Sequence, residues 1–290
     1  MKRILFPTDF SEAAQNAQNY ALGLAQLYNL EISFLHSIDV TKKYLSMSMM
    51  NTGDPSIPGF EPELMLETVN KEKENATEKL EALRKKAEDL NITANIELTS
   101  GNMHDDVISF ATKRNIDLIV MGTHGASGFK EAVIGSNAQK VVRLSPVPVI
   151  TIKEMPGDLK IENAVFGADF IEDEVNEAMP KVKDGAAFFG AGLDVVYINT
   201  PTYFERTDTS LKRMHNVLEK YDVPFSKCRV FNDFDIESGI VNYAKHANAD
   251  IIILSTHGFK GLKKLFNDNI TEAVVNSSNI PVLSINLQKH

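Results

Sequence analysis

The chain has 290 residues, of which 43% are hydrophobic and 24% charged, and its formal net charge is −9 at pH 7. This length predicts about two domains, each large enough to bury a hydrophobic core of ordinary size. The acidic balance argues against a nucleic-acid partner, because proteins that bind nucleic acids usually carry a basic face, and against binding to an anionic membrane surface.

The first half alternates short apolar runs with amphipathic segments of helical period. Residues 118–121 are continuously apolar, which is typical of a central parallel strand covered on both faces. The alternation predicts right-handed βαβ units in a doubly wound parallel sheet, where ligands bind beyond the carboxyl ends of the strands. We expect strands at 3–6, 31–37, 93–98, 117–121 and 147–152, and helices at 11–28, 64–90, 104–114 and 137–144.

One long segment of the first half fits none of these elements. Residues 39–62 are rich in Ser, Met, Pro and Gly, which predicts a long surface loop or lid. Two interpretations stay open: the loop folds over a bound ligand or a partner, or it is a disordered insertion. The charged segment 67–90 that follows has an apolar stripe, so it is expected to be a surface helix without a site.

The second half of the chain repeats the first. Residues 4–10 (ILFPTDF) match residues 164–170 (AVFGADF), and residues 117–130 match residues 250–263 around a shared Thr-His-Gly. Both halves also close on a similar run, SPVPVITI in the first and SNIPVLSI in the second. Self-similarity at a fixed spacing indicates two copies of one structural unit.

The division between the copies falls near Pro156 and Gly157, a pair that breaks regular structure. The first copy carries about 27 more residues than the second, mostly within 39–62. The sequence therefore predicts an α/β protein with two tandem doubly wound parallel five-stranded sheets of Rossmann-like type. The predicted domains are 1–153 and 160–290.

Cysteine and histidine content narrows the class of protein further. The single cysteine, Cys228, excludes a disulfide within the chain, and we expect it to be a structural residue at the start of a strand. No His-x3-His spacing is present, so no protein-built metal site is expected. The chain has no run of 18 apolar residues, and its first apolar stretch is too short for a signal peptide. These features predict a cytoplasmic protein without a membrane partner.

A glycine motif follows the fourth predicted strand. Gly122 and Gly125 are separated by two residues, and Gly135-Ser136 comes nine residues later, where the next helix opens. Glycine lets the backbone approach a ligand closely, and a helix N-terminus presents unpaired N–H groups and partial positive charge to a phosphate. The alternative is a glycine-rich turn with a Ser/Asn helix cap. No Gly-Lys-Ser/Thr sequence is present, so the motif is not a P-loop.

The sequence resembles the universal stress protein family in its tandem two-domain form. The resemblance covers nearly the whole chain, once per copy, and it implies an adenine nucleotide alpha hydrolase-like fold that binds ATP. In that family the Gly-x2-Gly-x9-Gly-Ser motif is the ATP-binding signature. The residues that carry the resemblance are Pro7-Thr8-Asp9-Phe10-Ser11, His36-Ser37, Gly122-Thr123-His124-Gly125, Gly135-Ser136 and Val147-Pro148-Val149.

The resemblance also implies which residues form the nucleotide site. Ser37 departs from the branched apolar residue common at its position, but the implied contact there is made by the main chain. Asp9 can also cap the helix that begins at Ser11, and His124 can also be a turn residue that sets the loop shape. The implied nucleotide-binding residues are Pro7, Thr8, Asp9, Ser37, Met121, Gly122, His124, Gly125, Gly135, Ser136 and Asn137.

The second copy has lost parts of this motif. Ser255 stands where the first glycine should be, and Asp268-Asn269 replaces Gly135-Ser136. Asp268 is expected to be a helix N-cap that places a carboxylate where a phosphate would sit. Two like charges at 4 Å repel by about 4 kcal/mol at an effective dielectric near 20, which corresponds to about a thousandfold in affinity. We therefore expect the second copy to keep the fold without binding ATP.

These observations predict an ATP-binding stress-response or signalling protein with one nucleotide site. The sequence does not separate ATP from AMP or ADP, and Mg²⁺ is expected only as a companion of the phosphates. No nucleophile–base pair is evident, so no catalytic residue is assigned. Two alternatives stay open: a slow ATP hydrolase of the adenine nucleotide alpha hydrolase group, and a ligand-free interaction scaffold. The resemblance implies that 148–152 and 281–285 can pair within the chain as a pseudo-dimer, and that whole chains can form a homodimer.

Overall fold

A computed structural model describes residues 1–41, 45, 62–123, 134–256 and 267–287. The elements expected in the first half are present, each with boundaries within about two residues of the prediction. They are β1 (Arg3–Pro7), α1 (Glu12–Leu27), β2 (Glu31–Ser37), α3 (Pro62–Asp89), β3 (Ala94–Thr99), α4 (Met103–Lys113), β4 (Leu118–Gly122), α5 (Ser136–Leu144) and β5 (Val149–Ile152).

The second half repeats the same alternation of strand and helix. Its elements are β6 (Asn163–Gly167), α6 (Glu172–Phe189), β7 (Gly192–Asn199), α7 (Thr207–Lys220), β8 (Lys227–Asn232), α8 (Ile236–His246), β9 (Ile251–Ser255), α9 (Asn267–Ser277) and β10 (Val282–Ile285). Even unusual backbone positions recur, because Phe10 and Phe170 both have a positive φ, at 59° and 58°. Asn115 and Asn248 share a φ of 50° just beyond α4 and α8, where asparagine tolerates the left-handed conformation.

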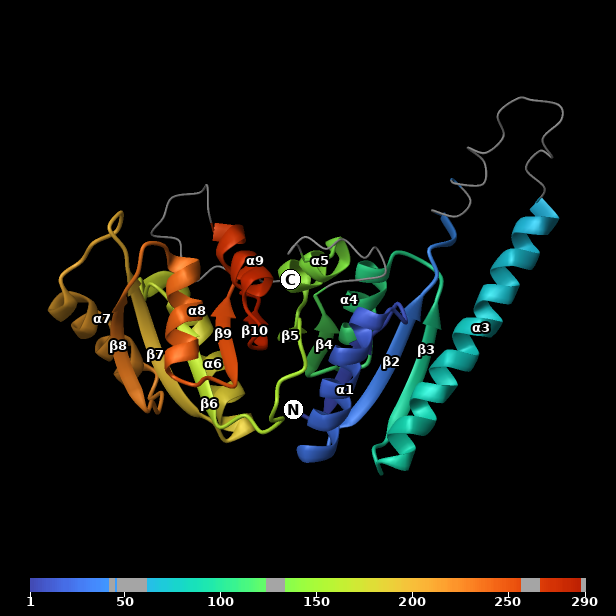
Figure 1. Cartoon of the computed structure of the whole chain (residues 1–290), viewed down its shortest axis with the longest axis horizontal. Helices are drawn as coiled ribbons and strands as arrows, with labels where there is room; N and C mark the ends of the chain where they lie inside the picture. The colour runs from blue at the N-terminus through green and yellow to red at the C-terminus, as the bar shows by residue number, and fades with distance from the viewer. Residues whose placement is uncertain (42–44, 46–61, 124–133, 257–266, 288–290) are drawn as a thin grey trace.

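The strands form one row across the molecule (Figure 1) in the order β3-β2-β1-β4-β5-β10-β9-β6-β7-β8. Neighbouring strands are parallel within each half, and the halves meet through the antiparallel pair β5–β10, in which Leu283 lies opposite Ile150. The prediction of an α/β protein with doubly wound parallel sheets is confirmed, and the two five-stranded sheets share an edge. In each half the chain reverses its direction across the sheet between the first and fourth strands, which is where such sheets bind ligands.

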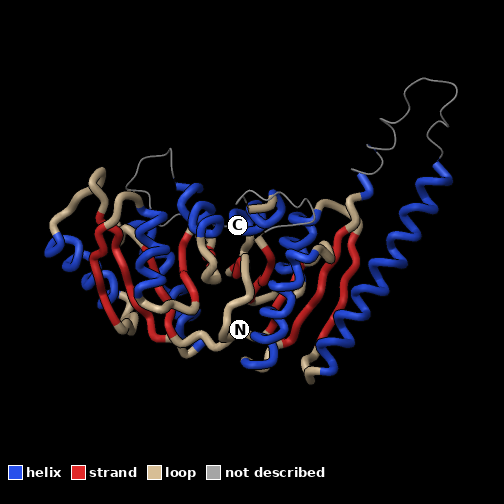
Figure 2. Tube along the Cα trace, in the orientation of Figure 1, coloured by secondary structure: helices blue, strands red, loops and turns tan. Residues whose placement is uncertain are grey.

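Helices cover both faces of the sheet (Figure 2), so the inner strands are buried on both sides, whereas the edge strands β3 and β8 are only partly buried. One apolar cluster lies beneath α1, α3, α6 and α7, and a second lies beneath α4, α5, α8 and α9. Alternate residues of β4 enter the two clusters, with Val120 in the first and Ile119 in the second. This double burial explains why the strand is continuously apolar in sequence. No helix among the described residues is both long and apolar enough to span a membrane.

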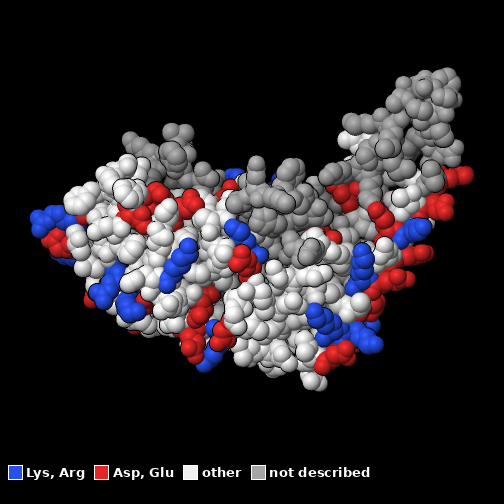
Figure 3. Space-filling view, viewed as in Figure 1, with Lys and Arg blue, Asp and Glu red and all other residues white. Residues whose placement is uncertain are grey.

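The charged helix α3 lies at one end of the row of strands (Figure 1), and Figure 3 shows acidic and basic side chains along its outer side. Its inward stripe contains Val69, Ala76, Leu80 and Ala87, which are all at least 94% buried. The expected surface helix is therefore present. The long loop that precedes it, expected at 39–62, lies almost wholly outside the described residues, so its role stays a prediction.

Candidate functional site

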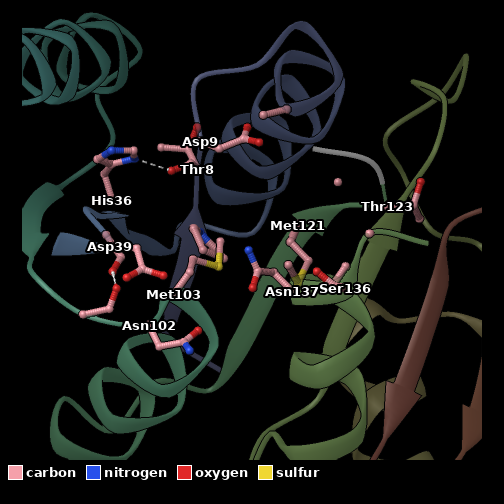
Figure 4. A pocket seen from close by; sticks show the side chains of 17 residues that line it. Thr8, Asp9, His36, Asp39, Asn102, Met103, Met121, Thr123, Ser136 and Asn137 are labelled. Carbon is pink, nitrogen blue, oxygen red and sulfur yellow. Dashed lines mark hydrogen bonds between the residues drawn. The ribbon is translucent and has the colours of Figure 1, made fainter. Parts of the chain in front are cut away.

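A cavity of about 490 Å³ opens at the carboxyl ends of β1, β2 and β4 (Figure 4). It lies at the reversal point between β1 and β4, where a doubly wound sheet leaves a crevice. Its volume is within the range of ordinary small-molecule sites. The lining residues are Pro7, Thr8, Asp9, Ala14, His36, Ser37, Asp39, Gly101, Asn102, Met103, Met121, Gly122, Thr123, Gly135, Ser136, Asn137 and Ala138.

Most residues that the resemblance assigned to the nucleotide site line this one cavity. They are Pro7, Thr8, Asp9, Ser37, Met121, Gly122, Gly135, Ser136 and Asn137. His124 and Gly125, the other two, lie outside the described residues. The motif and the first two strand ends, which are far apart in sequence, therefore meet around one space.

Sequence reasoning missed the wall formed by Gly101, Asn102 and Met103. The residues implied for the site follow the first, second and fourth strands, whereas these three follow the third. The register of the sheet pairs Ser37 with Thr99, so the end of β3 lies beside the end of β2. Because parallel strands end at one edge of the sheet, the order β3-β2-β1-β4 was the signal that could have identified this wall.

The turn between β1 and α1 is held by a series of short-range hydrogen bonds. The Phe10 N–H donates to Thr8 Oγ1 at 3.0 Å, and the Ser11 N–H donates to Asp9 Oδ1 at 3.0 Å. Ser11 caps α1, because its side chain accepts from the Ala14 N–H at 3.3 Å. The interpretation of Asp9 as the helix cap was therefore wrong. Asp9 instead stabilises the turn that precedes α1 by accepting from the Ser11 N–H, and its side chain is exposed at the edge of the cavity.

His36 braces the same turn from the neighbouring strand. Its Nδ1 donates to the Thr8 carbonyl at 2.8 Å, the contact drawn as a dashed line in Figure 4. Its ring lies over Phe10 with a centroid distance of 4.5 Å, and the Lys79 ammonium lies 5.2 Å from the centroid of the same phenyl ring. Phe10 can adopt its positive φ because these contacts fix it. His36 thus orients the turn that carries Asp9.

A carboxylate ties together the ends of β2 and β3. Asp106, in the first turn of α4, accepts from Ser37 Oγ and from Thr99 Oγ1, the latter at 2.7 Å. Ser37 Oγ also lies 3.0 Å from the Gly101 carbonyl, so the hydroxyl proton has two acceptors. The serine that departs from the family pattern is therefore part of a polar cluster, defined here as Ser37, Thr99 and Asp106, that fixes this wall of the cavity.

Replacement of Ser37 by alanine is expected to lower the free energy of unfolding by about 1 kcal/mol, the usual value of one hydrogen bond. The effect stays small because Thr99 still donates to Asp106. Denaturant unfolding measures it. Ser100→Ala is the control, because Ser100 is exposed and adjacent to the same wall. Equal stability of the two variants would contradict the role given to the Ser37 hydroxyl.

The opposite wall of the cavity is the start of α5. Gly135 is its N-cap residue, with φ −60° and ψ 143°, and no side chain among the described residues caps the helix. The first turn contains no acidic residue. The N-terminal N–H groups and the positive end of the helix dipole therefore face the cavity without a carboxylate competing for them. This is the arrangement that a phosphate or another anion requires.

Residues of the second half reach this wall. The Ile134 N–H, next to Gly135, donates to Asn276 Oδ1 of α9. Gln139 Nε2 of α5 donates to Glu272 Oε2 at 2.6 Å. Two further hydrogen bonds cross between the halves, one donated from each. Lys153 Nζ of the first half donates to the Asn276 carbonyl at 2.9 Å, and Asn286 Nδ2 of the second half donates to the Arg143 carbonyl at 2.7 Å. The segment that leads into α5 is thus held from the other half.

The start of α9, which is the equivalent region of the second half, differs from the prediction. Helix α9 begins at Asn267, so Asp268 lies in its first turn and is not the N-cap that the sequence suggested. The side chains of Asp268 and Asn269 lie outside the described residues. Asp169 repeats the geometry of Asp9, because its Oδ1 accepts from the Ile171 N–H at 3.0 Å.

Cys228 is half-buried in β8, and burial raises the pKa of its thiol to about 11. A thiol with so high a pKa is a poor nucleophile at neutral pH, which fits the structural role expected for it. Among the described residues, no group of three or more His, Cys, Asp or Glu side chains is arranged to hold a metal ion.

Comparison with known proteins identifies the fold and the family. Universal stress protein MJ0577 of Methanocaldococcus jannaschii is 32% identical over 157 residues, covering 52% of this chain and 94% of its own. Universal stress protein Slr1230 of a Synechocystis strain is 23% identical over 296 residues, covering 98% of this chain and 99% of its own. The crystal structure of a universal stress protein from Archaeoglobus fulgidus has a TM-score of 0.72 at 20% identity, covering 99% and 98% of the two chains.

The relative from Synechocystis and the structure from Archaeoglobus both extend over the whole length of the chain, so the likeness is not confined to the first half. The model of the Universal stress protein family matches residues 1–153 and again 232–286, which together are well over half of the chain. The resemblance suggested by the glycine motif is confirmed, and the chain belongs to the universal stress protein family.

Proposed function

We propose that this protein binds one adenine nucleotide, ATP, in the cavity of its first half and acts in stress response or signalling. The observation that carries the proposal is the N-terminus of α5, which no side chain of the described residues caps and which faces a cavity of about 490 Å³ behind its N-cap residue Gly135. A triphosphate offers the charge that such a helix end favours, and the backbone N–H groups of the first turn can hold it without a lysine.

The rest of the cavity is suited to the sugar and the base. Asp9 presents a carboxylate that can accept hydrogen bonds from ribose hydroxyls, and the turn around it is already braced by His36. The wall fixed by Ser37 and Asp106 gives the base a rigid edge. His124 and Gly125 belong to the proposed site by the family motif. Mg²⁺ enters this proposal only with the phosphates, because phosphate oxygens supply most of its ligands. AMP and ADP share the same base and ribose contacts.

We also propose that the chain is a pseudo-dimer of two domains, 1–153 and 160–290. The antiparallel pair β5–β10 and the reciprocal contacts of Lys153 and Asn286 support an approximate twofold relation between them. The second domain then has a structural or regulatory role. Pairing of whole chains into a homodimer and a cytoplasmic location stay predictions.

Calorimetric titration of the whole protein with ATP and Mg²⁺ tests the proposal. The expected result is one nucleotide per chain with micromolar affinity, because Asp268-Asn269 stands in the second half where the first has Gly135-Ser136. The protein must first be checked for nucleotide that is carried through purification. Two equal sites per chain would contradict the assignment of the site to the first half, and absence of binding would favour the ligand-free scaffold.

The rate of ATP hydrolysis distinguishes the proposed nucleotide-binding function from the alternative of a slow ATP hydrolase. Within the described part of the cavity, His36 Nδ1 donates to the Thr8 carbonyl, which makes the imidazole a brace of the turn and leaves its lone pair on Nε2. No nucleophile–base pair is evident in the sequence, so we expect phosphate release from bound ATP to be no faster than in a variant that lacks the Asp9 carboxylate. Release that depends on Asp9 or His124 would favour the slow hydrolase.

A further inference from the structure

A second cavity, of about 290 Å³, lies in the second half at the carboxyl ends of β6 and β7. Walls from the strand ends, from the loop that follows β7 and from α7 enclose it; in Figure 1 this loop is above the β7 and α7 labels. The lining residues are Ala168, Asp169, Ile171, Tyr197, Ile198, Tyr203, Phe204, Glu205, Arg213 and Ile236.

The strand registers show that this cavity is the counterpart of part of the first one. Pro7 pairs with Leu35 in the first half, and Gly167 pairs with Val196 in the second. The residues that follow these four therefore occupy equivalent places at the edge of the sheet. Met103 and Ile236 are equivalent as the first residues of α4 and α8.

Two of the equivalent positions have changed from polar to apolar, because Ala168 stands in the place of Thr8 and Ile198 in the place of Ser37. The imidazole of His36 is replaced by the phenol of Tyr197, and Ile236 stands in the place of the already apolar Met103. Ile198 also fills space that Asp106 occupies in the first half, because a Cβ added to Gly239 would lie 2.4 Å from Ile198 Cγ2. The second half has thus lost the polar wall.

Two of the three charged side chains that line this cavity, Arg213 and Glu205, are paired with each other. Arg213 donates from Nη1 to Glu205 Oε1 at 2.7 Å and from Nε to the Asp169 carbonyl at 3.1 Å. Its guanidinium also lies 5.3 Å from the centroid of the Tyr197 ring. The other oxygen of Glu205 accepts from Ser210 Oγ. An anionic ligand would meet two carboxylates and a guanidinium whose charge is already offset, so a phosphate is disfavoured.

The mouth of the cavity is aromatic and preformed. Phe204 is 74% exposed and belongs to the lining of the cavity. The loop that carries it is fixed, because Tyr197 Oη donates to the Tyr203 carbonyl at 3.3 Å and the Glu205 N–H donates to Asn199 Oδ1 at 2.9 Å. A rigid mouth spares a ligand the cost of ordering it. Aromatic walls favour a flat ring that can stack against them.

We propose that the second half binds a small, uncharged, planar ring compound between Tyr197, Ile198, Phe204 and Ile236. This site is separate from the proposed nucleotide site and does not depend on it. Its walls offer dispersion and stacking, and its charged side chains disfavour a phosphate. One chain would then carry two ligand sites of different chemistry on equivalent edges of one sheet.

Indole and indole-3-acetate form a matched pair of probes, because they share one ring system and differ in charge. The chain contains seven tyrosines but no tryptophan, so excitation at the long-wavelength edge, where tyrosine no longer absorbs, selects the indole ring of the probe. Fluorescence anisotropy of each probe is measured as the concentration of the whole protein is raised. Indole is expected to bind at least about tenfold more tightly than indole-3-acetate. Equal affinities, or no rise in anisotropy with indole, would overturn the proposal.

Two exposed phenylalanines supply the variant and its control. Phe204→Ala removes a wall of the cavity and is expected to weaken indole binding at least about fivefold without affecting folding, because the side chain is 74% exposed. Phe234→Ala removes a ring that is 88% exposed and does not line the cavity, so it should bind indole as the unaltered protein does. Saturating ATP should leave indole bound. Displacement of indole by ATP, or equal affinities of the two variants for indole, would show that the probe binds at another site and would overturn the proposal.

Discussion

Replacement of Gly135 by aspartate is expected to abolish ATP binding while the fold is retained. Gly135 has φ −60°, which any residue can adopt, and aspartate is a good N-cap residue. The new carboxylate would cap α5 itself and occupy the place of a phosphate. At 4 Å and an effective dielectric near 20, the repulsion is about 4 kcal/mol, or about a thousandfold in affinity. Calorimetric titration with ATP and Mg²⁺ measures the loss, and thermal unfolding checks the fold.

Gly157→Asp is the matched control for this variant. It introduces the same charge on an exposed segment, and a Cβ added there meets no atom within 4 Å. The control should bind ATP with unchanged affinity. Binding by Gly135→Asp within about threefold of the unaltered protein would show that no phosphate lies against α5, and the proposed function would then fail at its central contact.

The strands and helices could be predicted because local patterns determine them. Residues 118–121 are apolar without interruption because β4 is buried on both faces, and the boundaries of β2 agree at both ends with the prediction. The meeting of Asp9, Gly122 and Gly135 around one cavity also follows from the topology, because parallel strands end at one edge. These features need only hydrophobic period and the general behaviour of doubly wound sheets.

Features that depend on the exact start of a helix could not be predicted. Ser11 and Asp9 are both good caps, and only the geometry of the turn shows that Ser11 caps α1, while Asp9 accepts from the Ser11 N–H two residues along the chain. In the same way Asp268 was placed before α9, which begins one residue ahead of it. Helix boundaries are uncertain by one or two residues in any sequence-based prediction, and a cap changes its role over that distance.

Contacts between segments that are distant along the chain could also not be predicted from the sequence. Ile134 and Asn276 are 142 residues apart, and no periodic pattern relates them. Their contact depends on the way the halves are joined at β5 and β10, which brings α9 beside the start of α5. The hydrogen bond is nevertheless close to the proposed phosphate contact, because Ile134 is the residue before Gly135. The second half therefore has a direct physical route to the site of the first.

Replacement of Asn276 by leucine is expected to weaken ATP binding by about tenfold, although Asn276 does not line the cavity. Leucine has a similar size but no acceptor, so the Ile134 N–H loses its partner in a residue that is only 5% exposed. An unsatisfied buried donor costs about 1–3 kcal/mol, and the segment can relieve this only by moving. Movement of Ile134 displaces Gly135 and the first N–H groups of α5. Calorimetric titration with ATP measures the loss of affinity.

Asn279→Leu separates this effect from a general loss of stability. Asn279 lies just after α9, is exposed, and donates to Glu154 Oε2 at 3.0 Å, so its replacement also removes one contact between the halves. Because Glu154 is distant in sequence from Gly135 and belongs to no wall of the cavity, ATP affinity should be unchanged. If Asn276→Leu also binds ATP normally, the second half only supports the fold. If Asn276→Leu weakens binding and Asn279→Leu does not, the second half positions the nucleotide site of the first half. Any ligand or partner that shifts α9 can then control that site.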